Sequence, residues 1–582
     1  WPVVLETIVS FMTLLAAGRG WWGASSHSVP YMKSYTMRAK MMAQITERVN
    51  MFRGRDSQTS SLWGRRRRRP QHPEGEAPMT TPAPAPTSDA GIRELLDSIP
   101  TGILIGNEWR ESSSGERFDV LNPATGEVLT TVASATPEDA AEAMDLAART
   151  QRSWQATSPR ERADILRRAY ELVVGPFRKR LARVMTLEMG KPLDQADAEV
   201  TYGSEFLRWF AEEAVRIRGD YFRLPEGHLQ AVVVRRPVGP CLFITPWNFP
   251  LAMATRKAAP AFAAGNVAIL KPSQDTPLTS LLFAQVLVEA GLPAGVLAVL
   301  PTNRSRALTG PLIADPRLRK ISFTGSTGVG KALLAEAAQG VLRTSMELGG
   351  NAPFIVFDDA DLDAAVDAAV ITKMRNMGEA CNAADHFFVQ GGVYDEFTRR
   401  FAEVMASQRV GNGLEPGVAV GPLVSARQRT SVAELVAGAI ESGATALVGG
   451  FVPEGAGFFY PPTVLTDVDP HAEIVTNEIF GPVAPVIRFD NEEEVIGLVN
   501  TDTVGLSAYL HTSSTARILR MAELLEVGML GVNSATISNA AAPFGGVKES
   551  GMGREGGKEG IEDYLETVYV GMPAPNLHLE RE

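Results

Sequence analysis

The sequence predicts a mixed α/β protein built around parallel β-sheet, and three observations carry that prediction. Short apolar segments with the length of buried strands recur between residues 240 and 359. Amphipathic, helix-like segments alternate with them. Turns rich in glycine and proline separate the two kinds of segment. Such alternation is typical of strand–helix–strand units, which build parallel sheets.

Two helices are expected ahead of the first buried strand. Thr136 followed by Pro137 matches a helix N-cap and the first helical position. Ser158, Pro159 and Glu161 match a capping box at the start of the next helix. Both helices therefore have start signals of their own.

The alternation then runs in order along the chain. Proline inside the helix expected at 251–265 (Pro260) should kink or shorten it, and Gly291 should close the helix expected at 276–291. The expected strands are 240–248, 266–273, 295–300, 319–325 and 353–359, and the third helix is 326–340. Ligands of parallel sheets gather beyond the carboxyl ends of strands, which is where Asn248, Lys271 and Ser326 fall.

Composition limits the function classes. The chain has 582 residues, enough for more than one domain. Its net charge of -11 argues against nucleic acid as the main partner. Cys241 and Cys381 cannot form a disulfide framework, and seven scattered histidines show no metal-site spacing. We expect a cytoplasmic protein without a metal. The apolar stretch 8–17 is too short to span a membrane.

Residues 1–78 differ in character from the rest. Five consecutive arginines, 65–69, could bind nucleic acid, act as a targeting signal or belong to a disordered tail. Order-promoting periodicity begins only after the Pro/Ala/Thr linker 80–90. We expect residues 1–90 to be a disordered extension, or one that arises from start-site assignment with Met79 as the biological start.

The stretches that could carry chemistry are each ambiguous alone. Cys381 is either a nucleophile or a buried apolar filler. Glu347 is either a surface residue or a base with a raised pKa, and Asn248 either donates to an oxyanion or closes a turn. "FTGSTGVGK" (323–331) fits a phosphate-binding helix start or a plain turn. It also fits a P-loop, except that Ala332 replaces the magnesium-binding hydroxyl.

Together, these motifs resemble the NAD(P)-dependent aldehyde dehydrogenase superfamily from about residue 91 to 572. The resemblance rests on "TPWNFP", "ILKPS", "FTGSTGVGK", "MELGGNAPF", "GEAC", "NEIFGPV" and "PFGGVKESGMGREGG", in this order. It implies that Cys381 is the nucleophile, that Asn248 stabilises the oxyanion and that Glu347 activates water. Because Asn248, Glu347 and the cofactor motifs accompany Cys381 in the family order, the interpretation as a buried apolar filler applies to Cys241 instead.

The resemblance also implies an architecture. We expect a Rossmann-like cofactor-binding domain at 91–345, an α/β catalytic domain at 346–535, a return segment at 536–572 and a tail at 573–582. A small β oligomerisation domain should combine 222–238 with that return segment in a homodimer or homotetramer. Its strands "LQAVVVRRPVG" and "YLETVYVGM" are either ordinary edge strands or pair with another subunit.

Cofactor contacts follow from the same resemblance. Gln274 stands where many NAD-preferring relatives carry a glutamate, and a neutral side chain does not repel a 2′-phosphate. We therefore expect NADP to be accepted or preferred over NAD. The residues expected to contact the cofactor are Thr245, Pro246, Trp247, Lys271, Ser273, Gln274, Gly325, Ser326, Gly330, Leu348, Glu478 and Phe480.

Within the superfamily, the chain is most similar to succinate-semialdehyde dehydrogenases, through "WFAEEAVRIRGD", "KMRNMGEAC", "ISNAAAPFGG" and "EGIEDYLE". This likeness implies that Arg216, Arg375 and Ser538 bind the far carboxylate of succinate semialdehyde. A related semialdehyde, such as glutarate semialdehyde, is the alternative substrate.

The chain departs from the family pattern after the nucleophile. The family commonly reads "AANRF", whereas this chain reads "AADHF" with Asp385 and His386. Asp385 either raises the pKa of the thiol or faces away from it. Ala383 replaces the second cysteine of some relatives, so a disulfide switch should be absent.

Overall fold

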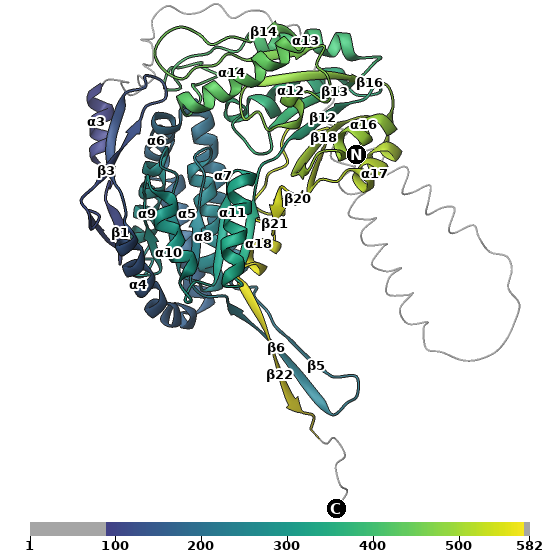
Figure 1. Ribbon diagram of the computed structural model, residues 1–582. Helices are drawn as coiled ribbons and strands as arrows, with labels where there is room; N and C mark the ends of the chain where they lie inside the picture. The colour runs from purple at the N-terminus through teal and green to yellow at the C-terminus, as the bar shows by residue number, and fades with distance from the viewer. Residues whose placement is uncertain (1–88, 576–582) are drawn as a thin grey trace, which may run out of the picture. The chain divides into compact units, whose positions relative to one another are not determined.

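The computed structural model describes residues 89–575 (Figure 1). The expectations for the apolar stretch 8–17, the arginine run 65–69 and the end of the tail, 576–582, lie outside the described residues. Helix α3 (Asp89–Asp97) opens the described part, so helical structure begins at the end of the predicted extension.

The first sheet has eight strands in the order β2-β1-β9-β8-β7-β10-β11-β21. Its five central strands are parallel, and β1 and β21 join antiparallel at either side. The strands are β1 (Ile103–Ile105), β2 (Glu108–Arg110), β7 (Cys241–Ile244), β8 (Ala268–Lys271), β9 (Leu297–Val299), β10 (Lys320–Thr324), β11 (Arg343–Glu347) and β21 (Gly551–Met552). The expected α/β class is confirmed.

Helices cover both faces of this sheet, which explains why its inner strands β7, β8 and β9 are buried along their whole length. Along β7, Cys241 and Phe243 belong to one core, whereas Leu242 and Ile244 belong to the other. Helices α5, α7, α8 and α9 pack with one another on the first face, and α4, α10 and α11 on the second (Figure 1). Their bounds are α4 (Pro137–Ala156), α5 (Pro159–Val174), α6 (Arg178–Met189), α7 (Leu193–Ala214), α8 (Pro250–Ala264), α9 (Pro277–Glu289), α10 (Ser305–Ala314) and α11 (Thr327–Gln339).

Two local expectations need correction. The full capping box lies at α4, where Thr136 and Asp139 bond reciprocally; at α5, Ser158 accepts from the backbone of Glu161 without the return bond. Helix α8 is not shortened by Pro260 and continues to Ala264. All its residues are buried, so packing outweighs the lost hydrogen bond.

The second sheet has seven strands in the order β14-β15-β16-β13-β12-β18-β19. The chain leaves the first sheet after Glu347 and enters the second at Ala352. The strands are β12 (Ala352–Val356), β13 (Ala384–Gln390), β14 (Thr445–Val448), β15 (Thr463–Thr466), β16 (Val483–Phe489), β18 (Ser507–His511) and β19 (Met529–Val532). The helices are α12 (Leu362–Met374), η2 (Arg375–Gly378), α13 (Tyr394–Ala406), α14 (Ala426–Glu441), α15 (Glu473–Thr476), α16 (Glu492–Asn500) and α17 (Thr515–Leu524).

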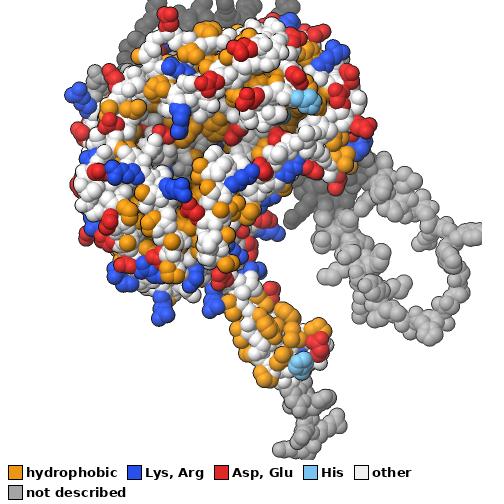
Figure 2. All heavy atoms as spheres, in the orientation of Figure 1, with side chains coloured by type: hydrophobic (Ala, Val, Ile, Leu, Met, Phe, Trp, Pro, Cys, Tyr) orange, Lys and Arg blue, Asp and Glu red, His pale blue; other side chains and the backbone are white. Residues whose placement is uncertain are grey.

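A third sheet projects from this body as a narrow ribbon (Figure 1). It consists of β5 (Asp220–Arg223), β6 (Leu229–Pro237) and β22 (Leu565–Pro573) in the order β22-β6-β5. The two β segments flagged in the sequence therefore pair with each other, antiparallel, within one chain. The two edges of this sheet are β5 and β22, and both carry exposed apolar side chains such as Tyr221 and Tyr569. Figure 2 shows apolar side chains at the surface of the ribbon.

Smaller elements complete the chain: β3 (Arg117–Leu121) with β4 (Val128–Ala133), β17 (Val504–Gly505) with β20 (Val547–Lys548), and α18 (Glu559–Glu562). Within residues 89–575, no helix is both long and apolar enough to cross a membrane. Nor does that part of the chain group three or more His, Cys, Asp or Glu side chains as a metal site would require.

Candidate active site

The predicted catalytic residues come from both large sheets. Glu347 is the last residue of β11, and Asn248 follows β7, its second neighbour in the first sheet. Cys381 precedes β13 of the second sheet. Gly350 joins the two sheets: a Cβ built there would lie 2.4 Å from the carbonyl oxygen of Cys381. Only glycine permits this approach, which explains the Gly-Gly turn after Glu347.

Cys381 lies at the end of a strained loop. Asn376 and Met377 both have φ of 54°, and Gly378 has φ of 78°, which are left-handed conformations that ordinary side chains avoid. After the loop, Ala380 and Ala383 pack against the start of α8. The thiol keeps partial exposure, yet burial raises its pKa to about 12, an effect that Arg256 opposes. The thiol is therefore protonated near neutral pH and needs a base.

Asn248 is buried and held from several sides. Its amide Nδ2 donates to the carbonyl of Glu379 at 3.1 Å. The backbone carbonyl of Asn248 accepts from Lys191 Nζ at 2.7 Å and from Asn376 Nδ2 at 3.1 Å. One amide N–H thus remains for a ligand, in a side chain whose position the neighbours fix. This arrangement suits an oxyanion donor.

Glu347 has two buried carboxylate oxygens, and neither has a hydrogen-bond partner. Burial, followed by repulsion from Glu555, raises the pKa of Glu347 well above its usual range. Arg256 and Lys257 oppose that shift. A carboxylate that is left unpaired and shifted toward neutral pH has the properties of a general base.

Arg256 is a site residue that sequence reasoning missed. It is buried in α8, its guanidinium lies 2.7 Å from Glu555, and it stacks 4.0 Å from the ring centroid of Phe544. Its Nε is buried without a hydrogen-bond partner. Among the charges that act on the Cys381 thiol, that of Arg256 is the strongest. Two adjacent cations, Arg256-Lys257, in an otherwise apolar helix were the signal.

Two of the three predicted substrate residues lie beside Cys381. Arg375 stacks on the ring of Phe249 at 5.1 Å and also lowers the pKa of the thiol. Ser538 Oγ accepts from Asn382 Nδ2 at 3.2 Å, one residue beyond the nucleophile.

Arg216 lies elsewhere, and this corrects the prediction made for it. Its exposed guanidinium pairs with Glu213 at 2.6 Å, one turn back along the chain. It lines a cavity of about 240 Å³ at the base of the projecting ribbon, together with Arg235 and Lys558.

The residues expected at the nicotinamide end come together. The rings of Trp247 and Phe480 meet edge to face at 5.3 Å. Glu478 accepts from the backbone N–H of Gly350 at 3.2 Å. Burial raises the pKa of Glu478 to about 8, with Asp385 adding to the shift. A Cβ at Gly349 would lie 2.8 Å from the Glu478 carboxylate, so a side chain there would displace that carboxylate.

The residues expected at the phosphate end lie on β10, on α11 and in the turn between them. Ser326 is the N-cap of α11, is exposed and makes no capping bond, so the helix start is open to an anion. Gly330 packs on Leu348, where a Cβ would meet the side chain at 2.3 Å, and Gly325 donates to the Glu347 carbonyl at 3.1 Å. Lys331 pairs with Glu549 at 2.7 Å, which disfavours a P-loop.

The residues expected at the adenosine end follow β7 and β8 or end them. Burial lowers the pKa of Lys271 to about 8. The hydroxyl of Thr245, whose backbone pairs with Lys271, is buried without a partner. Ser273 bonds to Asp275, and Gln274 is exposed. Pro246 is half-buried in the turn before Trp247. The unpaired hydroxyl of Thr245, the buried amine of Lys271 and the open start of helix α11 together fit the binding of a dinucleotide.

Asp385 is not among the charged residues that shift the pKa of the Cys381 thiol most strongly. It is buried and pairs with Lys373 at 3.0 Å. Glu478 and Glu347 are the anions that raise the pKa of Cys381 most strongly. Burial lowers the pKa of His386 to about 3, so this side chain is neutral. Of the two alternatives for Asp385, the structure favours the one in which it faces away.

Comparisons with known proteins agree with this site. Residues 109–570 match the model of the aldehyde dehydrogenase family, and the chain belongs to that family. It is therefore an oxidoreductase of the aldehyde dehydrogenase class, as the motifs predicted.

Individual relatives show which kinds of aldehyde dehydrogenase this chain is similar to. A succinate-semialdehyde dehydrogenase of Paenarthrobacter nicotinovorans is 57% identical over 77% of this chain and 99% of the relative. A glutarate-semialdehyde dehydrogenase of Pseudomonas aeruginosa is 46% identical over 80% of this chain and 96% of the relative. The crystal structure of an E. coli NADP dependent enzyme is 43% identical, with a TM-score of 0.81 over 83% of this chain and 99% of that chain.

Proposed function

We propose that this protein oxidises succinate semialdehyde to succinate with NADP or NAD. The observation that carries the proposal is Arg375, a half-buried cation on the loop that leads to Cys381, whose guanidinium lies over the rings of Phe249 and Tyr202. A short aldehyde with a carboxylate at its far end needs fixed cations near the reacting carbon. Ser538 adds a hydroxyl to the same side of the site.

The chain's own residues divide the work. Cys381 attacks the aldehyde carbon after losing its proton, and the raised pKa of Glu347 makes that carboxylate the acceptor. The free amide N–H of Asn248 donates to the oxyanion. A bound NAD(P) would supply the hydride acceptor for that carbon, and Trp247, Glu478 and Phe480 would hold its nicotinamide end. After Glu347 has released that proton to solvent, it takes a proton from the water that hydrolyses the thioester. It then returns this proton to the leaving thiolate of Cys381, and the acid and a free thiol result.

Cofactor choice depends on Gln274. Its side chain is neutral and exposed beside the adenosine end of the site, so a 2′-phosphate meets no repulsion from it. The NADP dependent relative is consistent with this. We predict that Gln274→Glu lowers kcat/KM for NADP by about tenfold or more, as expected for one new charge repulsion, while kcat/KM for NAD changes little. Equal changes for both cofactors would show that Gln274 does not face the ribose.

The substrate is tested through Arg375. Arg375→Ala should raise KM for succinate semialdehyde by about 10–100-fold, the usual cost of one charge-assisted hydrogen bond. KM for propanal, which has no carboxylate, should stay near the wild-type value. Initial rates at 340 nm measure both. Equal effects on the two aldehydes would refute the carboxylate site. A higher kcat/KM for glutarate semialdehyde than for succinate semialdehyde would favour the alternative substrate.

The same proposal covers assembly and location. The exposed apolar strands β5 and β22 support a homodimer or homotetramer joined through the ribbon, and sedimentation velocity tests it.

The cytoplasmic location expected from the two free cysteines stays a prediction. So do the division into domains and the small-molecule aldehyde as the main partner in place of nucleic acid.

A further inference from the structure

Asp385 and Lys373 form a buried ion pair that the proposed chemistry does not use. Lys373 Nζ lies 3.0 Å from Asp385 Oδ1, and both side chains are almost wholly buried. Lys373 is in the last turn of α12, and Asp385 is the second residue of β13, four residues after the nucleophile. Burying two charges is costly unless their attraction and further hydrogen bonds offset the lost hydration.

A break in the strand ladder directs Asp385 to its partner. Ala384 pairs with Ala352 of β12, but His386 pairs with Pro353, the very next residue. Asp385 is therefore the extra residue of a β-bulge. Bulges redirect side chains and concentrate near active sites. Pro353 has no N–H to donate at this point of the ladder.

Both members of the pair contact the turn of residues 478–481. Lys373 Nζ donates to the carbonyl of Gly481 at 3.2 Å. The backbone N–H of Ile479 hydrogen-bonds to Asp385. These contacts flank Phe480, whose φ of 52° is left-handed. A non-glycine residue persists there only if its surroundings hold it.

The same turn lies against the loop that carries the nucleophile. A Cβ at Gly378 would lie 2.1 Å from the carbonyl oxygen of Gly481. The ion pair thus joins the strand after Cys381 to the turn that carries Glu478 and Phe480.

We propose that Asp385 is a positioning residue: with Lys373, it holds the turn of residues 478–481 so that Glu478 and Phe480 face the nicotinamide half of the cofactor. The inference rests on the proposed function, because that function assigns Glu478 and Phe480 to the cofactor.

The test measures NADP binding to the full chain by isothermal titration calorimetry. Asp385→Ala removes the acceptor for Lys373 and Ile479, and should raise Kd about tenfold, as for residues that share one hydrogen-bond network. Asp385→Asn keeps an acceptor oxygen and should restore the wild-type Kd. Asp359→Asn removes an ion-paired aspartate on another part of the second sheet and should leave Kd unchanged.

A double-mutant cycle with Glu478→Gln separates positioning from general packing. If Asp385 acts through the turn, Asp385→Ala should change Kd far less in the Glu478→Gln background than in the wild type. If the changes in Kd of the two single variants simply multiply in the double variant, the inference is overturned. An unchanged Kd in Asp385→Ala overturns it as well. If Asp385→Ala fails to fold, Lys373→Met carries the same test, because it removes the donor to Gly481. Wild-type protein that binds neither NADP nor NAD overturns the proposed function itself.

Discussion

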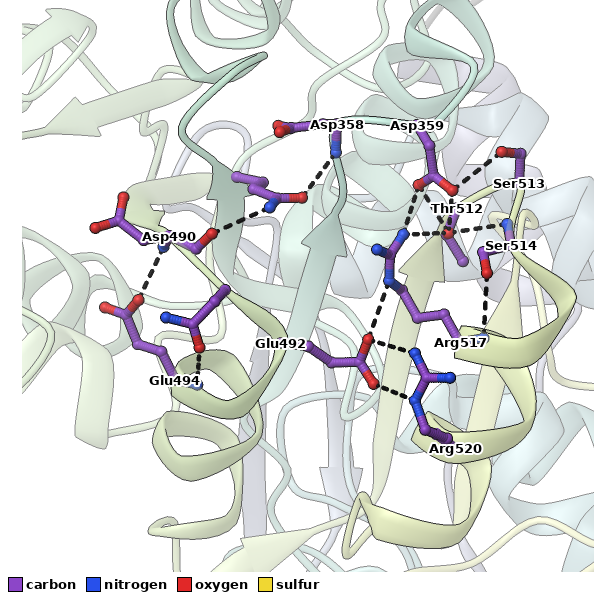
Figure 3. Close-up of polar contacts among 12 residues, drawn as sticks. Asp358, Asp359, Asp490, Glu492, Glu494, Thr512, Ser513, Ser514, Arg517 and Arg520 are labelled. Carbon is purple, nitrogen blue, oxygen red and sulfur yellow. Dashed lines mark hydrogen bonds and ion pairs between the residues drawn. The ribbon is translucent and has the colours of Figure 1, made fainter.

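Two groups of polar side chains differ in how completely they are paired. Figure 3 shows the first, beyond the carboxyl ends of β12 and β18. Asp359 accepts from Thr512, Ser513 and Arg517. Glu492 accepts from both Arg517 and Arg520. Every carboxylate oxygen of these two residues has a donor.

The active site is the opposite case. Both oxygens of Glu347, the Oδ1 of Asn248 and the Nε of Arg256 are buried without a hydrogen-bond partner. The pKa shifts follow the pairing. At Asp359, burial is the largest single influence and raises the pKa, but the hydrogen bonds from Thr512 and Ser513 and the charge of Arg517 together lower the pKa below its usual value. At Glu347 nothing offsets burial fully. Folded proteins leave few buried polar groups unpaired, so such a cluster marks atoms kept free for a ligand.

The largest effect is expected where the carboxylate is unpaired. Glu347→Gln should lower kcat by about 10²–10⁴-fold, the usual contribution of a general base. It should also stabilise the fold at alkaline pH. The folded pKa is raised, so ionisation above the unfolded value near 4.5 destabilises the native state, and glutamine cannot ionise. Thermal melts across pH 5–9 should show the gain growing with pH; a loss of stability would contradict the assigned direction.

A second effect is expected where the charges are buried but paired. Lys191 and Glu199 lie 2.5 Å apart, both almost wholly buried, and Glu199 also accepts from the backbone at the start of α8. Lys191→Met should lower the free energy of unfolding by about 3–5 kcal/mol, because it leaves a buried charge alone. Urea denaturation measures it. Lys331→Met, which breaks the exposed pair with Glu549, is the matched control and should cost less than about 1 kcal/mol.

The smallest effect is expected in the exposed network of Figure 3. Asp359→Asn should cost about 0.5 kcal/mol, as exposed ion pairs do, and leave kcat and KM unchanged. Its folded pKa is lowered, so the stability it contributes is present above the unfolded pKa and is lost as the pH falls. The difference between variant and wild type should therefore vanish in acid. A large loss of activity would show that this network reaches the site.

The comparison also explains which site residues the sequence could identify. Cys381, Asn248 and Glu347 lie in short motifs of fixed spacing, each at the end of a strand or in a tight turn. Arg256 lies inside a helix, where the same residue type is usually a surface charge. Its importance depends on which neighbours surround α8, and no local pattern records that. The motif around Arg216 likewise does not indicate what its side chain faces, and its guanidinium is exposed.

By itself, the sequence determined the α/β alternation, the order of the strands along the chain and the catalytic motifs. These follow from local rules: apolar runs, caps, and glycines that only certain turns accept. The tertiary structure decided what long-range packing alone can decide. It paired β6 with β22 across more than 300 residues, kept Pro260 inside a helix, brought Arg256 to the thiol and turned Asp385 toward Lys373. Each depends on contacts between segments distant in sequence, because burial and charge pairing are properties of the assembled core.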